Sequence, residues 1–218
     1  MRYVMSDLHG MYDKFIEMLD KINFSENDEL YILGDIFDRG KDSIKILEYI
    51  WSKNNIFLIK GNHEHIFEKC YEDESNIPLW FHNGGRTTYL NLEMKDKEFI
   101  YKTYNYIKNL PLIMNIDEYI LVHAGLYIPD NYKELTINEI INLQTEEDLL
   151  WNRELINNDK YIEGYTIILG HTPTIGINNS PNIITKKGKI LIDCGAVFEQ
   201  YDGKLSCLCL EDKTEYYV

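Results

Sequence analysis

Aspartate, histidine, asparagine and arginine side chains, which can bind metal ions and phosphate, recur in short clusters along the 218-residue chain. The candidates are Asp7, His9, Asp35, Asp38, Arg39, Asn62, His63, His123, Arg153 and His171. Oxygen and imidazole ligands without thiolates suit Mn, Fe or Zn and fit poorly with a cysteine-based structural zinc site. Because carboxylates can bridge two ions, the set is large enough for a pair of divalent metals.

Nearly all of these residues come directly after short apolar runs that have the length and composition of strands. The runs cover residues 3–5, 30–33, 56–59, 119–122, 166–169 and 189–192, and they lead into SDLHG, GDIFDRG, KGNHE, HAG, GHTP and DCGA. Open α/β sheets build their sites in the crevice outside the carboxyl ends of the strands. We therefore expect the polar clusters to form one site at the strand ends.

Apolar residues at helical spacing follow the first two clusters. They are Phe15, Met18, Leu19 and Ile22, and then Ile44, Leu47, Ile50 and Trp51. The chain therefore begins as βαβαβ, which predicts parallel strands joined by helical crossovers. A further helix is predicted over residues 99–107, before Pro111, and Thr136 with Glu139 forms a capping-box pattern ahead of a short helix. The last residues predict two strands around a turn at Asp212, so an antiparallel portion completes the structure.

Composition limits the class of protein. The net charge is −14 and no dense Lys/Arg cluster offsets it, which disfavours broad binding to nucleic acid or to anionic membranes. The four cysteines form no CxxC pair, and Cys207 and Cys209 would share one face of a strand, which suits a reducing compartment. No segment approaches the roughly 20 apolar residues of a membrane span, and SDLHG comes too early for a signal peptide. We expect one α/β domain over residues 1–218, located in the cytoplasm.

Taken singly, each cluster also has an ordinary structural explanation. Asp7 and His9 could form a turn after a strand, and His123 could be a half-buried core histidine. Asp38 and Arg39 could be a surface ion pair worth roughly 0–1 kcal/mol. Five separate strand ends that carry ligand-type residues, in a chain with only 6 His, are hard to explain by chance. The conjunction therefore favours a functional site.

The ordered set DxHG, GDxxDRG, GNHE, HAG and GHT resembles the calcineurin-like metallophosphoesterases. Within them it is most similar to the phosphoprotein phosphatase group, which contains the serine/threonine phosphatases and compact bacterial and phage members. HNGG at 82–85, WNRE at 151–154 and IDCGAVF at 192–198 extend the resemblance over nearly the whole chain. The resemblance implies an α/β fold with central mixed β-sheets, packed as a β-sandwich and flanked by helices.

The resemblance also implies a role for each candidate residue. One metal would be held by Asp7, His9 and Asp35, and the second by Asp35, Asn62, His123 and His171, with Asp35 as the bridge. His63, paired with Asp38, would be the general acid for the departing alkoxide. Arg39, Arg153 and Asn62 would contact the phosphate, for which a guanidinium offers a planar pair of donors. Glu64 receives no role.

The leading prediction is a serine/threonine protein phosphatase that acts on a phosphorylated protein or peptide. Two divalent ions, with Mn expected first and Fe or Zn as alternatives, would activate a water for in-line attack. The alternative is a symmetrical bis(5'-nucleosyl)-tetraphosphatase, since such enzymes share most of the motifs. They commonly lack the aspartate of DRG and carry Asp after GNH, whereas this chain has Asp38 and Glu64. A non-catalytic phosphate or metal sensor is the alternative from another class, and the intact ligand set argues against it.

Overall fold

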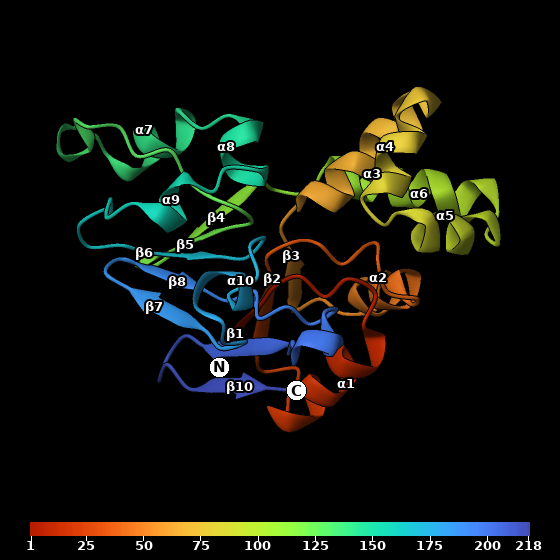
Figure 1. Cartoon of the computed structure of the whole chain (residues 1–218), viewed down its shortest axis with the longest axis horizontal. Helices are drawn as coiled ribbons and strands as arrows, with labels where there is room; N and C mark the ends of the chain where they lie inside the picture. The colour runs from red at the N-terminus through yellow and green to blue at the C-terminus, as the bar shows by residue number, and fades with distance from the viewer.

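The computed structural model describes all residues 1–218 and contains two mixed five-stranded β-sheets with helices around them (Figure 1). The first sheet has the order β10-β9-β1-β2-β3 and the second the order β4-β5-β6-β8-β7. The first comprises β1 (Arg2–Met5), β2 (Glu29–Ile32), β3 (Ile56–Leu58), β9 (Ser206–Cys209) and β10 (Glu215–Tyr217). The second comprises β4 (Ile113–Ile116), β5 (Tyr119–Val122), β6 (Thr166–Leu169), β7 (Ile184–Lys186) and β8 (Lys189–Leu191).

All six apolar runs of the sequence form strands, and the predicted parallel pairing is confirmed. Strand β1 pairs with β2 and β2 with β3 in parallel, as do β5 with β6 and β6 with β8. The remaining pairs are antiparallel, including the carboxyl-terminal hairpin of β9 and β10 around Asp212. Strands β4 and β7 had no apolar run to predict them, because each lies at an edge and is only partly buried.

The predicted helices are also present. Helices α1 (Tyr12–Lys21) and α2 (Ser43–Trp51) form the first two crossovers, and α6 (Lys97–Lys108) ends before Pro111. Helix α7 (Ile137–Asn142) begins with the expected capping box of Thr136 and Glu139. The sequence did not indicate the other helices, which are α3 (Asn62–Glu72), α4 (Ile77–His82), α5 (Arg86–Glu93), α8 (Glu146–Leu150), α9 (Glu154–Asn157) and α10 (Ile175–Asn178).

The core is layered, because side chains alternate between the two faces of each strand. Val4, Tyr31 and Leu208 of the first sheet pack with Leu121 and Ile168 of the second, so the two sheets form the expected β-sandwich. The outer face of the first sheet packs on α1 and α2, and the outer face of the second on residues from α7, α8 and α9. Figure 1 shows α3–α6 gathered on the opposite side of the molecule from α7–α9. Both helical groups flank the strand ends.

Two expectations extend beyond this architecture. None of the helices combines the length and the apolar character that crossing a bilayer would require. The cytoplasmic location and the single domain over residues 1–218 stay predictions.

A buried lysine fixes the segment after Arg153. Lys189 on β8 is only 1% exposed, and its Nζ donates to the carbonyls of Leu155 at 2.6 Å and Asn158 at 2.7 Å. Lys189→Met leaves both carbonyls without this donor, so we expect the free energy of unfolding to fall by about 1–3 kcal/mol in urea titrations. The exposed Lys133→Met is the control and should stay within about 0.5 kcal/mol. If the free energy of unfolding falls no more in K189M than in the control, the hydrogen bonds of Lys189 make no net contribution to stability.

Candidate metal centre

The structure brings the candidate residues together where strands of both sheets end. Asp7 and His9 follow β1, Asp35, Asp38 and Arg39 follow β2, Asn62 and His63 open α3 after β3, His123 follows β5, and His171 follows β6. The backbone amide of His171 donates to Asp7 Oδ2 at 2.9 Å, which joins a loop of the second sheet to one of the first. All the candidates are buried except the two arginines, which are exposed.

Four side chains converge on the point predicted for the second metal. His123 Nε2 lies 2.8 Å from Asn62 Oδ1, 3.1 Å from His171 Nδ1 and 3.5 Å from Asp35 Oδ2. Asn62 Oδ1 is also 2.9 Å from His171 Nδ1. In addition, His171 Nε2 is buried without a hydrogen-bond partner. A cation at this point would be coordinated by these nitrogen and oxygen atoms, which otherwise face one another at short distances.

The point predicted for the first metal is built differently from the expectation. The ligand atoms that lie within 4.8 Å of one another belong to His9, Asp35 and His63, and Asp35 is shared with the second cluster. Asp7 is buried nearby, but its Oδ2 accepts hydrogen bonds from the His171 amide and the Ser6 hydroxyl. The structure therefore places Asp35 between the two groups, and Asp7 as a ligand stays a prediction.

Backbone carbonyls fix the ring orientation of two candidate ligands. His9 Nδ1 lies 2.8 Å from the Phe37 carbonyl, and His123 Nδ1 lies 2.6 Å from the Leu33 carbonyl. A carbonyl can only accept, so Nδ1 carries the proton in both rings. Each ring then turns its Nε2 toward Asp35. Such outer contacts are typical of metal-binding histidines.

The electrostatics of the centre also suit cations. Burial lowers the pKa of His9 well below its usual range, and burial beside His123 lowers the pKa of His171 to about 2. Both rings are therefore neutral, as metal ligation requires. Burial, together with the charge of Asp7, raises the pKa of Asp35 well above its usual value. A divalent ion would offset that cost, so the donor set of carboxylate, amide and neutral imidazole fits divalent metals.

His63 and Asp38 form a buried pair beside the shared carboxylate. His63 Nδ1 is 2.7 Å from Asp38 Oδ2, and its Nε2 is 3.9 Å from Asp35 Oδ2. Burial opposes protonation of His63, but the charge of Asp35 and the hydrogen bond to Asp38 outweigh it, so the pKa of His63 is raised. Trp80 Nε1 donates to both oxygens of Asp38, at 3.0 and 2.9 Å. The bond to Asp38 therefore fixes the ring so that His63 Nε2 faces the centre.

The two arginines lie at the exposed edge of the centre. Arg39 donates from Nη1 to His9 Nε2 at 2.6 Å, and its Nη2 lies 3.0 Å from His63 Nε2. A metal on His9 would require this guanidinium to turn away, which would leave its donors available to a phosphate. Arg153 Nε donates to Thr172 at 3.1 Å, and its charge contributes to the low pKa of His171. Both positions are compatible with phosphate binding, which stays a prediction.

Glu64 is the functional residue to which the sequence assigned no role. Its side chain is fully buried at 0% exposure and accepts four backbone amides. Oε2 accepts from Asp35 at 2.7 Å and Gly61 at 2.9 Å, while Oε1 accepts from Ile36 at 3.0 Å and Phe37 at 3.1 Å. Glu64 thus fixes the loop that carries Asp35 against the start of α3. A signal was present, since Glu three residues after Gly61 has the spacing of a capping residue.

The backbone of the site is strained. Residues other than glycine with positive φ include Asp7 (53°), His9 (41°), Asp35 (55°), Asp38 (71°), Arg39 (67°) and His171 (65°). Left-handed conformations are costly for such residues and gather at functional sites when the surroundings enforce them. Gly61 is part of that enforcement, because a Cβ there would overlap Oδ1 and the amide of Asp35. The sequence motifs therefore encode backbone shape as well as ligands.

The HNGG segment has a structural role. Gly84 has φ 93°, and its carbonyl accepts the Arg39 amide at 3.0 Å. A Cβ on Gly85 would overlap the indole of Trp80. The side-chain amide of Asn83 donates to the Leu79 carbonyl at 2.9 Å. The turn supports the loop of Asp38 and Arg39 from behind.

Glu64→Gln tests the carboxylate that joins the loops. The amide replaces an acceptor with a donor that faces backbone amides, so we expect the free energy of unfolding to fall by about 2–4 kcal/mol. Metal affinity, measured by calorimetry with Mn²⁺, should fall about 10–100-fold. Glu17→Gln, an exposed glutamate on α1, is the control and should change neither quantity appreciably. Wild-type stability and affinity in E64Q would refute the role of Glu64.

Metal stoichiometry tests the shared carboxylate. After loading and dialysis, elemental analysis should give about two Mn²⁺ per wild-type chain and about one for His9→Ala. Asp35→Asn removes a ligand common to both groups, so both ions should be lost. Retention of both ions by D35N would exclude Asp35 as the bridge.

Comparison with known proteins agrees with this geometry. The family model of the calcineurin-like phosphoesterases matches residues 3–193. Among solved structures, one described as a putative diadenosine tetraphosphatase covers 100% of this chain and 92% of its own, with a TM-score of 0.67 and 19% sequence identity. At that identity the likeness shows the fold alone.

Two kinds of curated relative share this sequence. A "Bis(5'-nucleosyl)-tetraphosphatase, symmetrical" of Wigglesworthia glossinidia brevipalpis is 50% identical over 64 residues, which are 28% of this chain and 24% of that protein. The match thus spans about a quarter of that relative. A "Serine/threonine-protein phosphatase 2" of Salmonella typhimurium is 29% identical over 183 residues, 78% of each chain. With a family match over most of its length, the chain belongs to the calcineurin-like phosphoesterases.

Proposed function

We propose that this chain hydrolyses phosphoesters at a dinuclear metal centre, with His63 as the acid that protonates the leaving group. The observation that carries the proposal is the buried pair of His63 and Asp38 directly beside Asp35, the carboxylate common to both ligand groups. An acid held next to a metal-binding carboxylate is the arrangement that phosphoester cleavage needs. A sensor of phosphate or metal would have no use for it.

The side chains divide the work. Asp7, His9 and Asp35 would hold one ion, and Asp35, Asn62, His123 and His171 the other. Divalent ions, with Mn as our first choice, would supply an activated water and neutralise the phosphoryl oxygens. Arg39, Arg153 and the amide of Asn62 would orient the phosphate at the exposed edge. Asp38 holds the His63 ring so that Nε2 faces the departing oxygen, and Trp80 fixes Asp38 in turn.

As substrate, we put a symmetrical dinucleoside tetraphosphate first, ahead of the phosphoprotein that the sequence motifs favoured. Several of the similar curated proteins carry the tetraphosphatase name. The comparisons therefore support the alternative better than the leading prediction. Symmetrical cleavage releases a nucleoside diphosphate, which is a weakly basic leaving group and needs little protonation.

A phosphoserine or phosphothreonine protein is the second candidate, and the Asp38–His63 pair favours it. A serine alkoxide is strongly basic, so its departure gains most from an acid. The match to the relative named as a serine/threonine phosphatase also covers 78% of this chain, against 28% for the tetraphosphatase of Wigglesworthia glossinidia brevipalpis and 57% for that of Salmonella paratyphi C.

One parallel assay tests both whether the chain hydrolyses phosphoesters and which substrate it prefers. Mn²⁺-loaded enzyme and a chelated control are given diadenosine tetraphosphate, a phosphoserine peptide and 4-nitrophenyl phosphate. We expect metal-dependent turnover of at least the nucleotide, with two ADP as its products. Peptide turnover without nucleotide cleavage would instead establish the second candidate. No turnover of any of the three after metal loading would refute phosphoester hydrolysis.

Asp38→Asn isolates the acid. The amide can no longer hold His63 protonated, so turnover of an alkyl phosphate should fall about 10²–10⁴-fold. Turnover of 4-nitrophenyl phosphate, whose phenolate departs unaided, should fall much less. Metal content must stay at the wild-type level, since Asp38 is not among the ligands. Equal losses on the two leaving groups would remove the pair from the acid role.

A further inference from the structure

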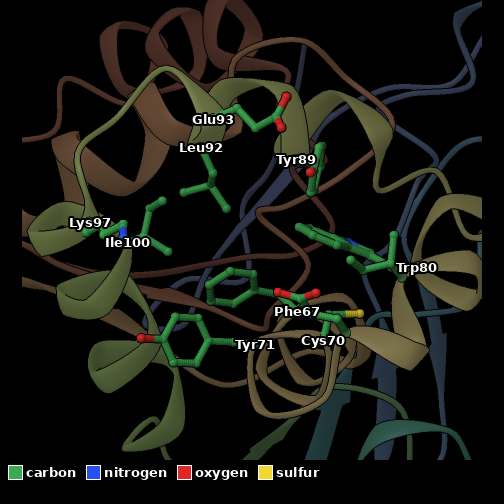
Figure 2. Close-up of a pocket in the computed structure, with 11 residues that line it drawn as sticks. Phe67, Cys70, Tyr71, Trp80, Tyr89, Leu92, Glu93, Lys97 and Ile100 are labelled. Atoms are coloured by element: carbon green, nitrogen blue, oxygen red, sulfur yellow. The ribbon is translucent and has the colours of Figure 1, made fainter.

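An apolar cavity of about 560 Å³ lies among α3, α4, α5 and α6, away from the metal ligands. Figure 2 shows its side chains arranged around an open space. Buried Phe67, Cys70, Trp80 and Leu92 form the floor. The volume falls within the range of small-molecule sites, which are mostly apolar with a few polar groups. The cavity is therefore large enough for an organic ligand.

One residue of the floor reaches the catalytic pair. The indole of Trp80 lines the cavity, and its Nε1 donates to both oxygens of Asp38, at 3.0 and 2.9 Å. Asp38 in turn lies 2.7 Å from His63 Nδ1. On its other side the indole is held by Gly85, where a Cβ would overlap the ring. A ligand in the cavity would thus contact the indole of Trp80, which fixes the position of Asp38.

The rim indicates the charge of the ligand. Glu74 and Glu93 lie at the exposed edge of the cavity with a single cation, Lys97. Two carboxylates against one ammonium disfavour an anion and attract a cation. The aromatic faces of Tyr71 and Tyr89, which also line the cavity, suit an organic ammonium group. The anionic substrate of the metal centre is therefore the wrong ligand here.

We propose that this cavity is an effector site for a small organic cation with an aromatic or aliphatic body, which acts on the leaving-group step through Trp80 and Asp38. The action on turnover rests on the proposed acid role of His63, whereas binding does not. Trp80 is a positioning residue in this scheme, because it touches Asp38 and not the substrate. A bound ligand changes how firmly the indole holds Asp38, so its effect depends on how much the leaving group needs an acid.

Binding is tested on the full chain loaded with diamagnetic Zn²⁺, by following the indole N–H signals of Trp51, Trp80 and Trp151 in an ¹⁵N-labelled sample. Trp80→Phe identifies the Trp80 signal. With 4-phenylbutylamine as the probe, the Trp80 signal should shift saturably with a Kd of about 1 mM or tighter. Trp151, whose ring lies 6.2 Å from His171 at the metal centre, should not shift. The anionic twin 4-phenylbutyrate should bind at least about fivefold more weakly.

Two exposed substitutions localise the site without touching the floor. The double variant Glu74→Gln and Glu93→Gln should weaken 4-phenylbutylamine about fivefold or more and leave basal turnover unchanged. Glu17→Gln, an exposed glutamate on α1, is the matched control and should change neither. Equal affinity for the amine and the carboxylate, or unchanged affinity in the double variant, would overturn the assignment.

The effect on turnover is measured separately. The saturating amine should change turnover of an alkyl phosphate about threefold or more and that of 4-nitrophenyl phosphate less than half as much, since only the former depends on the acid. Binding at Trp80 with equal effects on both, or with none, would overturn the coupling. If the untreated enzyme hydrolyses none of the three substrates of the parallel assay, the proposed function fails, and the Trp80 shift still decides whether the cavity binds the cation.

Discussion

The buried carboxylate of Glu64 is the contact on which the rest of the site depends. It accepts four backbone amides, three from the loop after β2 and one from the loop after β3. A buried carboxylate without partners would be strongly destabilising, and these donors offset that cost. In return, Asp35 is held next to the start of α3, which carries Asn62 and His63. The loops of two parallel strands therefore act as one rigid unit before any metal is bound.

Rigidity matters because the ligands are mutually unfavourable without cations. The ring of His123 points its Nε2 at the amide oxygen of Asn62 and at the carboxylate of Asp35, over distances of 2.8 and 3.5 Å. Left-handed backbone at Asp7, His9 and Asp35 adds further strain. The stability of the surrounding β-sandwich must offset the unfavourable free energy of this arrangement. Divalent ions would stabilise the folded state on binding and so offset part of that cost. The centre is thus preorganised for cations rather than assembled by them.

The sequence predicted the parts of the fold that leave a periodic signal. Six buried strands appear as apolar runs, and α1 and α2 as helical spacing, because burial selects residue type at each position. Edge strands β4 and β7 are half-exposed and left no such signal. Likewise, the candidate ligand residues stand out by their chemistry at strand ends, whereas Glu64 and Trp80 received no role. The spacing of Glu64 after Gly61 indicates a helix cap, but its bonds to the amides of the loop after β2 depend on how distant segments meet. The bond from Trp80 to Asp38 likewise joins distant segments and leaves no pattern in the sequence.

The burial of Asp38 bears on the choice between substrates. A fully buried carboxylate carries a large desolvation penalty, which the donors of Trp80 and His63 must offset. A nucleoside diphosphate departs readily on its own, so a tetraphosphatase gains little from keeping this pair. An alkoxide gains up to several powers of ten in rate. Identity to the tetraphosphatases is high over 28% of the chain, while the ligand and loop motifs serve either reaction. Sequence identity over this segment therefore indicates a shared phosphoesterase reaction. The preferred leaving group depends instead on Asp38, His63 and the side chains around them.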